Sequence, residues 1–240
     1  MNKNIKEEFI STLSHEIRTP LTSIKGFSQT MLSSWDKLDE NKKKEFLNII
    51  LNQSQRLIKL VENVLNVAKI DSDSQNLIFS KVDINKIVDT CINLEKITYK
   101  DFDFKFEKTN NSLFSLCDSD KLQQILLNIL ENACKYSFES KNIEIRTFIQ
   151  QENCVISVKN FGSFIKKENL EKIFEKFYRA DSYLNSTTQG SGLGLYIAKN
   201  LANRMNGDIK VVSCKEKNET EFLILMPIYQ IEEQTKKIGV

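Results

Sequence analysis

Hydrophobic residues in the first seventy positions recur at spacings of three and four, as they do along one face of an amphipathic helix. A polar segment at 36–41 separates two such stripes and predicts a turn. The pattern therefore predicts a helical hairpin. Because one hairpin cannot bury both stripes, whereas two hairpins form a closed four-helix bundle, we expect the chain to be a homodimer. The stripes comprise Phe9, Leu13, Ile17, Leu21, Ile24, Phe27 and Met31, then Phe46, Ile50, Leu57, Leu60, Val64 and Val67.

The pattern changes after Ile70, where the polar run 71–76 predicts a linker. The following segments alternate between the helical and the strand period, which predicts an α+β fold with helices on one face of a sheet. Helices are predicted at 84–97, 120–136 and 193–205, and strands at 102–106, 113–117, 143–149, 155–159, 209–213 and 221–226. The predicted divisions are a hairpin domain at 1–70, a linker and the start of the next domain at 71–82, a second domain at 83–229 and a tail at 230–240.

Composition narrows the class of protein. The 240 residues are 40% hydrophobic and 28% charged, as in ordinary globular proteins, and the net charge of +2 gives no basic footprint for nucleic acid. The five cysteines are dispersed and odd in number, which favours reduced thiols and a cytoplasmic location. No apolar run approaches the roughly 20 residues that cross a bilayer, so we expect membrane attachment only through segments absent from this chain, as in the cytosolic portion of a sensor.

His15 is the single histidine, and helical geometry places it opposite the apolar stripe, in water. Neutral imidazole is a competent nucleophile near physiological pH. Glu16 beside it can accept the displaced proton, and Thr19, one turn further on, can orient a water molecule at a phosphoryl group held on His15. Taken alone, a single exposed histidine is more often an ordinary surface residue.

The sequence around His15 favours a role for this residue as a nucleophile. Residues 14–21 read Ser-His-Glu-Ile-Arg-Thr-Pro-Leu and closely resemble the phosphoacceptor H-box of sensor histidine kinases. The hairpin as a whole resembles the dimerisation and phosphotransfer domain of that family. This resemblance implies catalytic roles for His15, Glu16 and Thr19.

The predicted helix that starts near residue 120 carries Asn128 and Asn132, four residues apart, so that both amides face one way and can offer oxygens to a metal-bound triphosphate. Lys135 can neutralise phosphate charge, and Tyr136 can lie beside the nucleotide. Two asparagines at this spacing are usually surface chemistry. The full run 128–136, however, resembles the N-box of the ATPases typified by histidine kinases, Hsp90, MutL and gyrase, and implies ATP with Mg²⁺ bound through Asn128 and Asn132.

A glycine-rich segment opens the predicted helix at 193–205 and can bring backbone N–H groups to phosphate oxygens. A dinucleotide fingerprint or a flexible loop could produce a similar run, although the G-x-G-x-x-G spacing is absent. The segment 173–179 resembles the F-box of the family, and 181–189 resembles its lid over ATP. Implied ATP-binding residues here are Phe177, Tyr178, Arg179, Gly190, Ser191, Gly192, Leu193, Gly194 and Leu195.

One motif departs from the family pattern. The G1 box normally reads Asp-x-Gly-x-Gly, whereas residues 160–164 read Asn-Phe-Gly-Ser-Phe. Asn160 can still accept a hydrogen bond from the adenine amino group, and its amide nitrogen can donate one to a ring nitrogen. Phe164 removes backbone freedom and narrows the site. The resemblance also places Gly162 and Ile165 in the ATP pocket.

The resemblance extends from Phe9 to Pro227. It implies a second domain of the GHKL (Bergerat) type, an α/β sandwich, and ATP-dependent autophosphorylation on His15. The phosphoryl group would then pass to an aspartate in the receiver domain of a response regulator, with phosphatase activity toward that regulator. Two alternatives are a signalling scaffold or phosphatase with a weakened ATP site, which the G1 departure motivates, and a stand-alone ATPase of the Hsp90 or MutL kind, which would not need the H-box hairpin.

Overall fold

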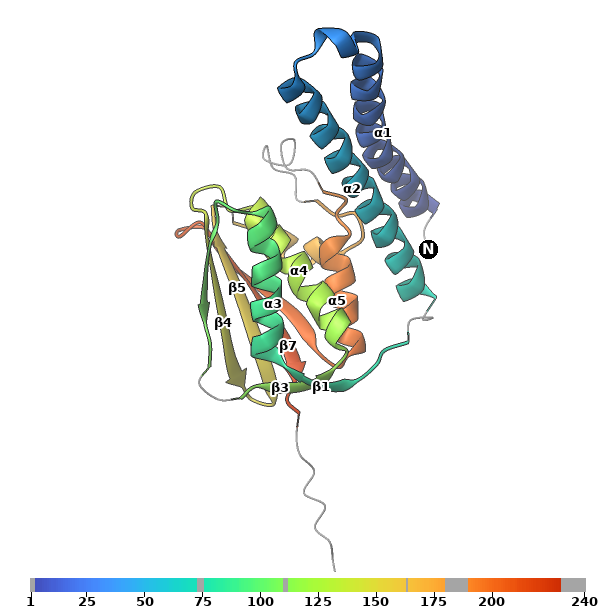
Figure 1. Ribbon diagram of the computed structural model, residues 1–240. Coiled ribbons are helices and arrows are strands. Elements are labelled where there is room, and N and C mark those ends of the chain that lie inside the picture. The colour runs from blue at the N-terminus through green and yellow to red at the C-terminus, as the bar shows by residue number, and fades with distance from the viewer. Residues whose placement is uncertain (1–2, 73–75, 110–111, 163, 180–189, 230–240) are drawn as a thin grey trace, which may run out of the picture. The chain divides into compact units, whose positions relative to one another are not determined.

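The computed structural model describes residues 3–72, 76–109, 112–162, 164–179 and 190–229 (Figure 1). The chain divides into two compact units, one formed by 1–75 with 175–197 and the other by 76–174 with 198–240. The predicted lid at 181–189 and the predicted tail at 230–240 lie outside the described residues. Within the described ranges, no helix is both long enough and apolar enough to cross a membrane.

The first unit contains the predicted helical hairpin. Helix α1 (Lys3–Ser34) contains Pro20 without interruption, a 3₁₀ turn follows at η1 (Trp35–Lys37), and α2 (Glu40–Asp71) returns. The carboxylate of Asp39 caps α2 by accepting a hydrogen bond from the Lys42 N–H at 2.8 Å. The helix that Asp39 caps begins at Glu40, inside the segment 36–41 that the sequence predicted as a turn. The predicted turn is therefore too long.

The two helices of the hairpin pack through part of their apolar surface. The rings of Phe27 and Phe46 lie 5.0 Å apart, and Met31, Leu60 and Val67 are buried. Leu21, which the sequence places in the first stripe, is 50% exposed. A second apolar row, which the sequence pattern had not separated from the first, stays exposed along α2. Its members are Leu47, Leu51, Ile58, Val61 and Leu65.

Residues 175–197 belong to the same unit as the hairpin. Both carboxylate oxygens of Asp71, the last residue of α2, accept hydrogen bonds from the Lys176 ammonium at 2.6 Å, and the Tyr196 hydroxyl donates to Asp71 at 3.1 Å. Partial burial lowers the pKa of Lys176, but the bonds with Asp71 and Tyr196 outweigh it, so the net pKa is raised.

The second unit is built on a five-stranded sheet in the order β2-β4-β5-β7-β6. Strands β2 and β4 are parallel, and the other neighbours are antiparallel. A separate antiparallel pair joins β1 (Ser80–Asp83) to β3 (Phe114–Cys117). All of these strands except β1 were predicted. The bounds in the large sheet are β2 (Asp103–Glu107), β4 (Asn142–Gln150), β5 (Asn153–Phe161), β6 (Asp208–Cys214) and β7 (Glu219–Pro227).

Helices α3 (Ile84–Thr98) and α4 (Ser119–Lys135) lie on one face of this sheet (Figure 1). Helix α5 (Gly194–Arg204) begins in the first unit and continues into the second, and the 3₁₀ turns η2 (Lys167–Asn169) and η3 (Lys172–Phe174) follow β5. The structure thus confirms the predicted α+β class and the helical segments to within one or two residues. The core between helices and sheet includes Leu122, Ile125, Ile129, Ile143, Ile156 and Phe222.

A buried carboxylate fixes the start of α4. Asp118 is 6% exposed and accepts hydrogen bonds from the N–H groups of Asp120 at 3.0 Å and Lys121 at 3.1 Å. It also accepts one from the N–H of Ile78 at 2.9 Å, which ties the segment before β1 to the helix. These three donors satisfy a group that would otherwise be costly to bury, and they set the position of every side chain on α4.

Candidate functional site

The predicted phosphoacceptor lies in the middle of α1. His15 is exposed, as its helical phase predicts. The Thr19 hydroxyl, one turn later, donates a hydrogen bond to the His15 carbonyl oxygen at 3.2 Å. The hydroxyl oxygen retains lone pairs that can accept from water. Thr19 therefore lies beside the acceptor, on the same exposed turn of the helix.

The carboxylate of Glu16, next to His15 in the sequence, is not free in solvent. Its carboxylate Oε2 accepts a hydrogen bond from the guanidinium of Arg56 on α2 at 3.0 Å. The side chains are only 15% and 24% exposed, respectively. The predicted proton acceptor is thus held in an ion pair that crosses the hairpin, and sequence analysis had not singled out Arg56.

The predicted N-box residues lie on α4. Asn128 and Asn132 are half-buried, and the Asn128 side-chain nitrogen Nδ2 is buried without a hydrogen-bond partner among the described residues. The Lys135 ammonium forms an ion pair with Glu131 at 2.9 Å, one turn earlier on the same helix. A buried amide nitrogen without a partner is unusual in a folded protein, and here the described residues leave this one unsatisfied.

Asn160 belongs to the segment that differs from the usual G1 box. It lies near the end of β5, the strand between β4 and β7, and is 1% exposed. Its amide nitrogen donates a hydrogen bond to the carbonyl oxygen of Tyr136, the residue that follows α4, at 3.2 Å. A second contact joins the same two elements, because the Ser137 hydroxyl lies within hydrogen-bond distance of the carbonyl oxygens of Phe161, at 3.0 Å, and Ser140. These hydrogen bonds connect the end of the segment compared with the N-box to the start of the segment compared with the G1 box.

Gly162 shows why one G1 glycine is required. Its φ is +125°, and a Cβ built there would lie 2.3 Å from the backbone nitrogen of Phe138 and 2.5 Å from that of Glu139. The Gly162 N–H donates to the Asn218 carbonyl oxygen at 2.7 Å. Only glycine allows both this conformation and this close approach of two backbones.

The other G1 position carries the bulky ring of Phe164. The Lys215 ammonium lies 5.7 Å from the centroid of this ring, so the ring contacts the turn between β6 and β7. The next residue, Ile165, donates its backbone N–H to the Ser213 hydroxyl at 2.8 Å. Phe164 and Ile165 thus both contact the β6–β7 hairpin.

The glycine-rich segment and the F-box contact each other within the first unit. Gly192 has a φ of +67°, and a Cβ there would lie 2.8 Å from the Phe177 backbone carbon. The Phe177 N–H donates to the Gly192 carbonyl oxygen at 3.1 Å. Leu193 is fully buried and anchors the segment, and α5 begins at Gly194, one residue later than predicted. Half-buried positions here are Tyr178, Arg179, Gly190, Ser191 and Leu195.

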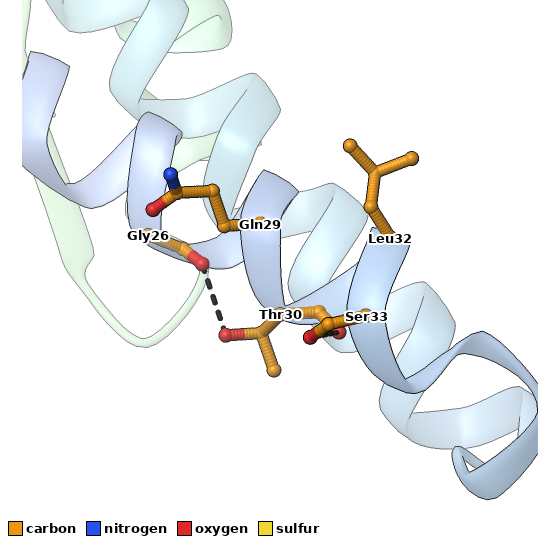
Figure 2. A pocket seen from close by; sticks show the side chains of 5 residues that line it. All are labelled: Gly26, Gln29, Thr30, Leu32 and Ser33. Carbon is orange, nitrogen blue, oxygen red and sulfur yellow. Dashed lines mark hydrogen bonds between the residues drawn. The ribbon is translucent and has the colours of Figure 1, made fainter.

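The described residues also form a hollow that contains no predicted catalytic residue. A shallow hollow on the exposed side of α1 is lined by Gly26, Gln29, Thr30, Leu32 and Ser33, and Figure 2 shows the Thr30 hydroxyl donating to the Gly26 carbonyl oxygen within it. Over the same described ranges, no three acidic, histidine or cysteine side chains lie close enough together to hold a metal ion.

Sequence reasoning missed Arg56 and Ser137. Arg56 lies forty residues from Glu16, and only the register between α1 and α2 brings them together. Ser137 directly follows the run compared with the N-box, so extending the motif by one residue would have included it.

Comparison with known proteins places both halves of the chain. Residues 5–73 match the His Kinase A (phospho-acceptor) domain, and residues 117–230 match the histidine kinase-, DNA gyrase B-, and HSP90-like ATPase domain. The sensor protein kinase WalK of Staphylococcus haemolyticus is 32% identical over 222 residues, which cover 92% of this chain and 36% of that protein. ArlS, a signal transduction histidine-protein kinase of the same species, is 35% identical over 88% of this chain and 46% of its own length.

Solved structures show the same fold. The histidine kinase ThkA in complex with the response regulator protein TrrA superposes with a TM-score of 0.68 at 28% identity, covering 94% of this chain and 63% of that one. The histidine kinase AdeS of Acinetobacter baumannii gives the same TM-score of 0.68 at 21% identity, with 90% and 98% covered. The chain spans less than half the length of the WalK and ArlS relatives just described. With both domain matches in the order of the motifs, the chain belongs to the sensor histidine kinases of two-component systems.

Proposed function

We propose that this chain transfers the γ-phosphoryl group of ATP to His15 and then to an aspartate in the receiver domain of a response regulator. The observation that carries the proposal is the exposed, single histidine in the segment that matches the phospho-acceptor domain, present in one chain with a segment that matches the ATPase domain. Neither feature alone would suffice, because exposed histidines are common and this ATPase domain serves several classes of enzyme.

The residues proposed to bind ATP fit their tasks chemically. Asn160 offers an acceptor to the adenine amino group, and Lys135 can exchange Glu131 for a phosphate oxygen. The glycine-rich segment, from Gly190 to the first residues of α5, brings backbone N–H groups to phosphate at a helix N-terminus. In the F-box, Arg179 is proposed to contact the terminal phosphate, in a part of the chain whose shape Phe177 and Gly192 fix.

Mg²⁺ fits the N-box. Asn128 and Asn132 present amide oxygens, which are hard ligands, and the unpartnered Asn128 nitrogen indicates that this amide is not committed to the protein. Two protein ligands are few, but Mg²⁺ usually takes the rest of its six from phosphate oxygens and water. When bound, Mg²⁺ would neutralise phosphate charge.

The proposed reaction balances without a further reactant. An imidazole nitrogen of His15 attacks the γ-phosphorus, the bond from that phosphorus to the β–γ bridging oxygen breaks, and ADP leaves with the electron pair. The ring proton passes to the Glu16 carboxylate and then to water. Most of the rate acceleration comes from positioning and charge neutralisation, as in other phosphoryl transfers.

The proposal includes a homodimer and a regulator as partners. The exposed apolar row Leu47, Leu51, Ile58, Val61 and Leu65 supports the dimer, because a second hairpin would cover it in a four-helix bundle. The ThkA structure, described as a complex with response regulator protein TrrA, supports a regulator as the second partner. Thr19, beside His15, is proposed to assist dephosphorylation of that regulator. The proposed location is the cytoplasm, where ATP and reduced thiols are found.

The purified chain, incubated with Mg²⁺ and ATP labelled in the γ-phosphate, tests the proposal. We expect label that is stable in base and labile in acid, and no label on the His15→Gln variant, which should still bind ATP. Asn132→Ala should bind ATP weakly and remain unlabelled although His15 is intact. Label that persists on His15→Gln would contradict the proposal.

A second candidate follows from Asn160 and Phe164, where the adenine site leaves the family pattern. In this alternative the chain is a scaffold or phosphatase with a weakened ATP site. It predicts no label on the wild type even at millimolar ATP, together with loss of phosphate from an already phosphorylated regulator. The same labelling experiment therefore decides between the two functions.

A further inference from the structure

We propose that Arg56 is a positioning residue for phosphorylation of His15, acting through the Glu16 carboxylate. The inference rests on the proposed kinase function and adds to it a residue on the second helix of the hairpin. Its basis is the hydrogen bond from the Arg56 guanidinium to Glu16 Oε2, at 3.0 Å, which joins α2 to the residue next to the acceptor.

The geometry selects one carboxylate oxygen for the proton. Arg56 occupies Oε2, and no other hydrogen bond to this carboxylate is found among the described residues. Oε1 carries no hydrogen bond among the described residues and is, in this proposal, the oxygen that accepts the ring proton of His15. A guanidinium bond to one oxygen restricts the rotation of the carboxylate and leaves the other oxygen available.

Burial makes this ion pair more effective than one at the surface. Glu16 is 15% exposed and Arg56 is 24% exposed, so solvent competes weakly for either charge. A glutamate side chain without such an anchor samples several rotamers, and only a few of them place an oxygen near the neighbouring imidazole. Arg56 restricts this sampling before ATP arrives, and preorganisation of this kind raises the rate of the chemical step.

A purely structural pair would leave a different kinetic signature. If the Arg56–Glu16 pair only joined the helices, removal of Arg56 would lower stability or dimerisation, and the rate would fall no further than the fraction of folded dimer. If Arg56 acts on the chemical step through Glu16, its removal should slow the folded dimer, and only while the Glu16 carboxylate is present. A double-mutant cycle in the rate of phosphohistidine formation, measured on folded dimer, separates these cases.

The experiment measures that rate, with labelled ATP and Mg²⁺, for the whole chain and for Arg56→Ala, Glu16→Gln and the double variant. We expect Arg56→Ala to slow phosphorylation at saturating ATP by about tenfold to hundredfold, with KM for ATP unchanged. Arg56→Lys should recover most of the loss. In the Glu16→Gln background, Arg56→Ala should change the rate by less than about twofold.

The control is Lys44→Ala, which removes an exposed positive charge from α2 and should leave the rate unchanged. Circular dichroism and the mass of the dimer verify folding. If Arg56→Ala does not fold, Arg56→Gln and Arg56→Lys complete the same cycle. Multiplicative effects of Arg56 and Glu16 substitutions, or a loss confined to KM for ATP, would overturn the role of Arg56 while leaving the kinase function intact. An unlabelled wild type would overturn the kinase function, and the role of Arg56 with it.

Discussion

The Asn160 side-chain nitrogen donates a hydrogen bond to the Tyr136 carbonyl oxygen at 3.2 Å, which joins the end of β5 to the residue after α4. Because the amide nitrogen faces Tyr136, the amide oxygen is the atom left to accept a bond from a nucleotide. An aspartate, the usual residue at this position of the family motif, could not donate to that carbonyl. Asn160 therefore holds two elements together through its nitrogen, and its oxygen is the atom that the proposed contact with adenine would use.

The substitution Asn160→Asp tests this dual role. It restores the family motif but replaces a donor with a carboxylate oxygen, at a position that is 1% exposed. We expect the free energy of unfolding in urea to fall by about 1–3 kcal/mol and ATP to bind no more tightly than to the wild type. Asn52→Asp, an exposed position on α2, controls for the added charge. Tighter ATP binding with unchanged stability would show that the Tyr136 contact has no structural role.

Substitution by alanine should destabilise the protein at one of two glycines in the segments compared with nucleotide-binding motifs and should have little effect at the other. Gly162 has a φ of +125° and backbone atoms at 2.3 Å from a built Cβ, whereas nothing lies within 4 Å of a Cβ at Gly190. Gly162→Ala should lower the free energy of unfolding by about 1–3 kcal/mol, and Gly190→Ala should change it by less than about 0.5 kcal/mol. Denaturant titration of both variants measures the difference. Equal stability of the two would contradict the close backbone approach at Gly162.

The exposed row on α2 predicts which substitutions break the dimer. Leu51 and Ile58 are 54% and 59% exposed in the single chain and are seven residues apart, on one face of the helix. Leu51→Glu combined with Ile58→Glu should yield monomers in analytical ultracentrifugation, because a four-helix core cannot bury four carboxylates. Asn52→Glu, at an exposed position of α2 about 100° around the helix from Leu51, should remain dimeric. A dimer that survives the double substitution would place the interface elsewhere.

The buried cysteines predict that their thiols react slowly with reagents and that the stability of the fold falls at alkaline pH. Burial raises the pKa of Cys91, Cys134 and Cys154 from 9.0 to about 12 and that of Cys117 to about 11. Ellman's reagent should therefore modify only the partly exposed Cys214 in the native protein and all five thiols after unfolding. Rapid native labelling of the four buried thiols would contradict this.

The sign of the linked pH effect follows from the same shifts. The folded state holds these thiol protons to a higher pH than the unfolded state, whose thiols ionise near 9.0. The stabilisation is therefore complete below pH 9 and is lost as pH rises toward the folded values of about 11 to 12. Urea midpoints that decrease above pH 9, and decrease less steeply in Cys91→Ala, would confirm the linkage. A midpoint that rises over this interval would contradict it.

Sequence patterns predicted most of the fold because most of its elements carry a periodic signal. The period-two and helical patterns located the strands of the large sheet and α3, α4 and α5 to within one or two residues. Strand β1 was missed because only Val82 among its four residues is buried, so no alternation exists to be recognised. Its partner is β3, more than thirty residues further along the chain.

The exposure of His15 was predicted from helical phase, and the structure confirms it. The contacts around the site were less accessible to sequence reasoning. The pairing of Glu16 with Arg56 depends on how α2 is aligned along α1, and no local pattern in the sequence reveals this alignment. The start of α2 is a different case, because Asp39 is a favourable capping residue and its position already implied the observed boundary. For ATP binding, the roles of the N-box, G1, F-box and glycine-rich residues remain predictions.

The pairing of β5 with β7 also has a consequence for folding order. Asn160 on β5 is aligned with Thr220 on β7, sixty residues later, whereas α1 and α2 are joined by one short turn. Contacts between distant residues form slowly, whereas the helical hairpin can close from its turn, near which the contacting residues Phe27 and Phe46 are only nineteen positions apart. During synthesis, the strand that carries Asn160 lacks one of its neighbours until nearly the whole chain has emerged. The hairpin that carries His15 can therefore fold well before the strand that carries Asn160 has both of its neighbours.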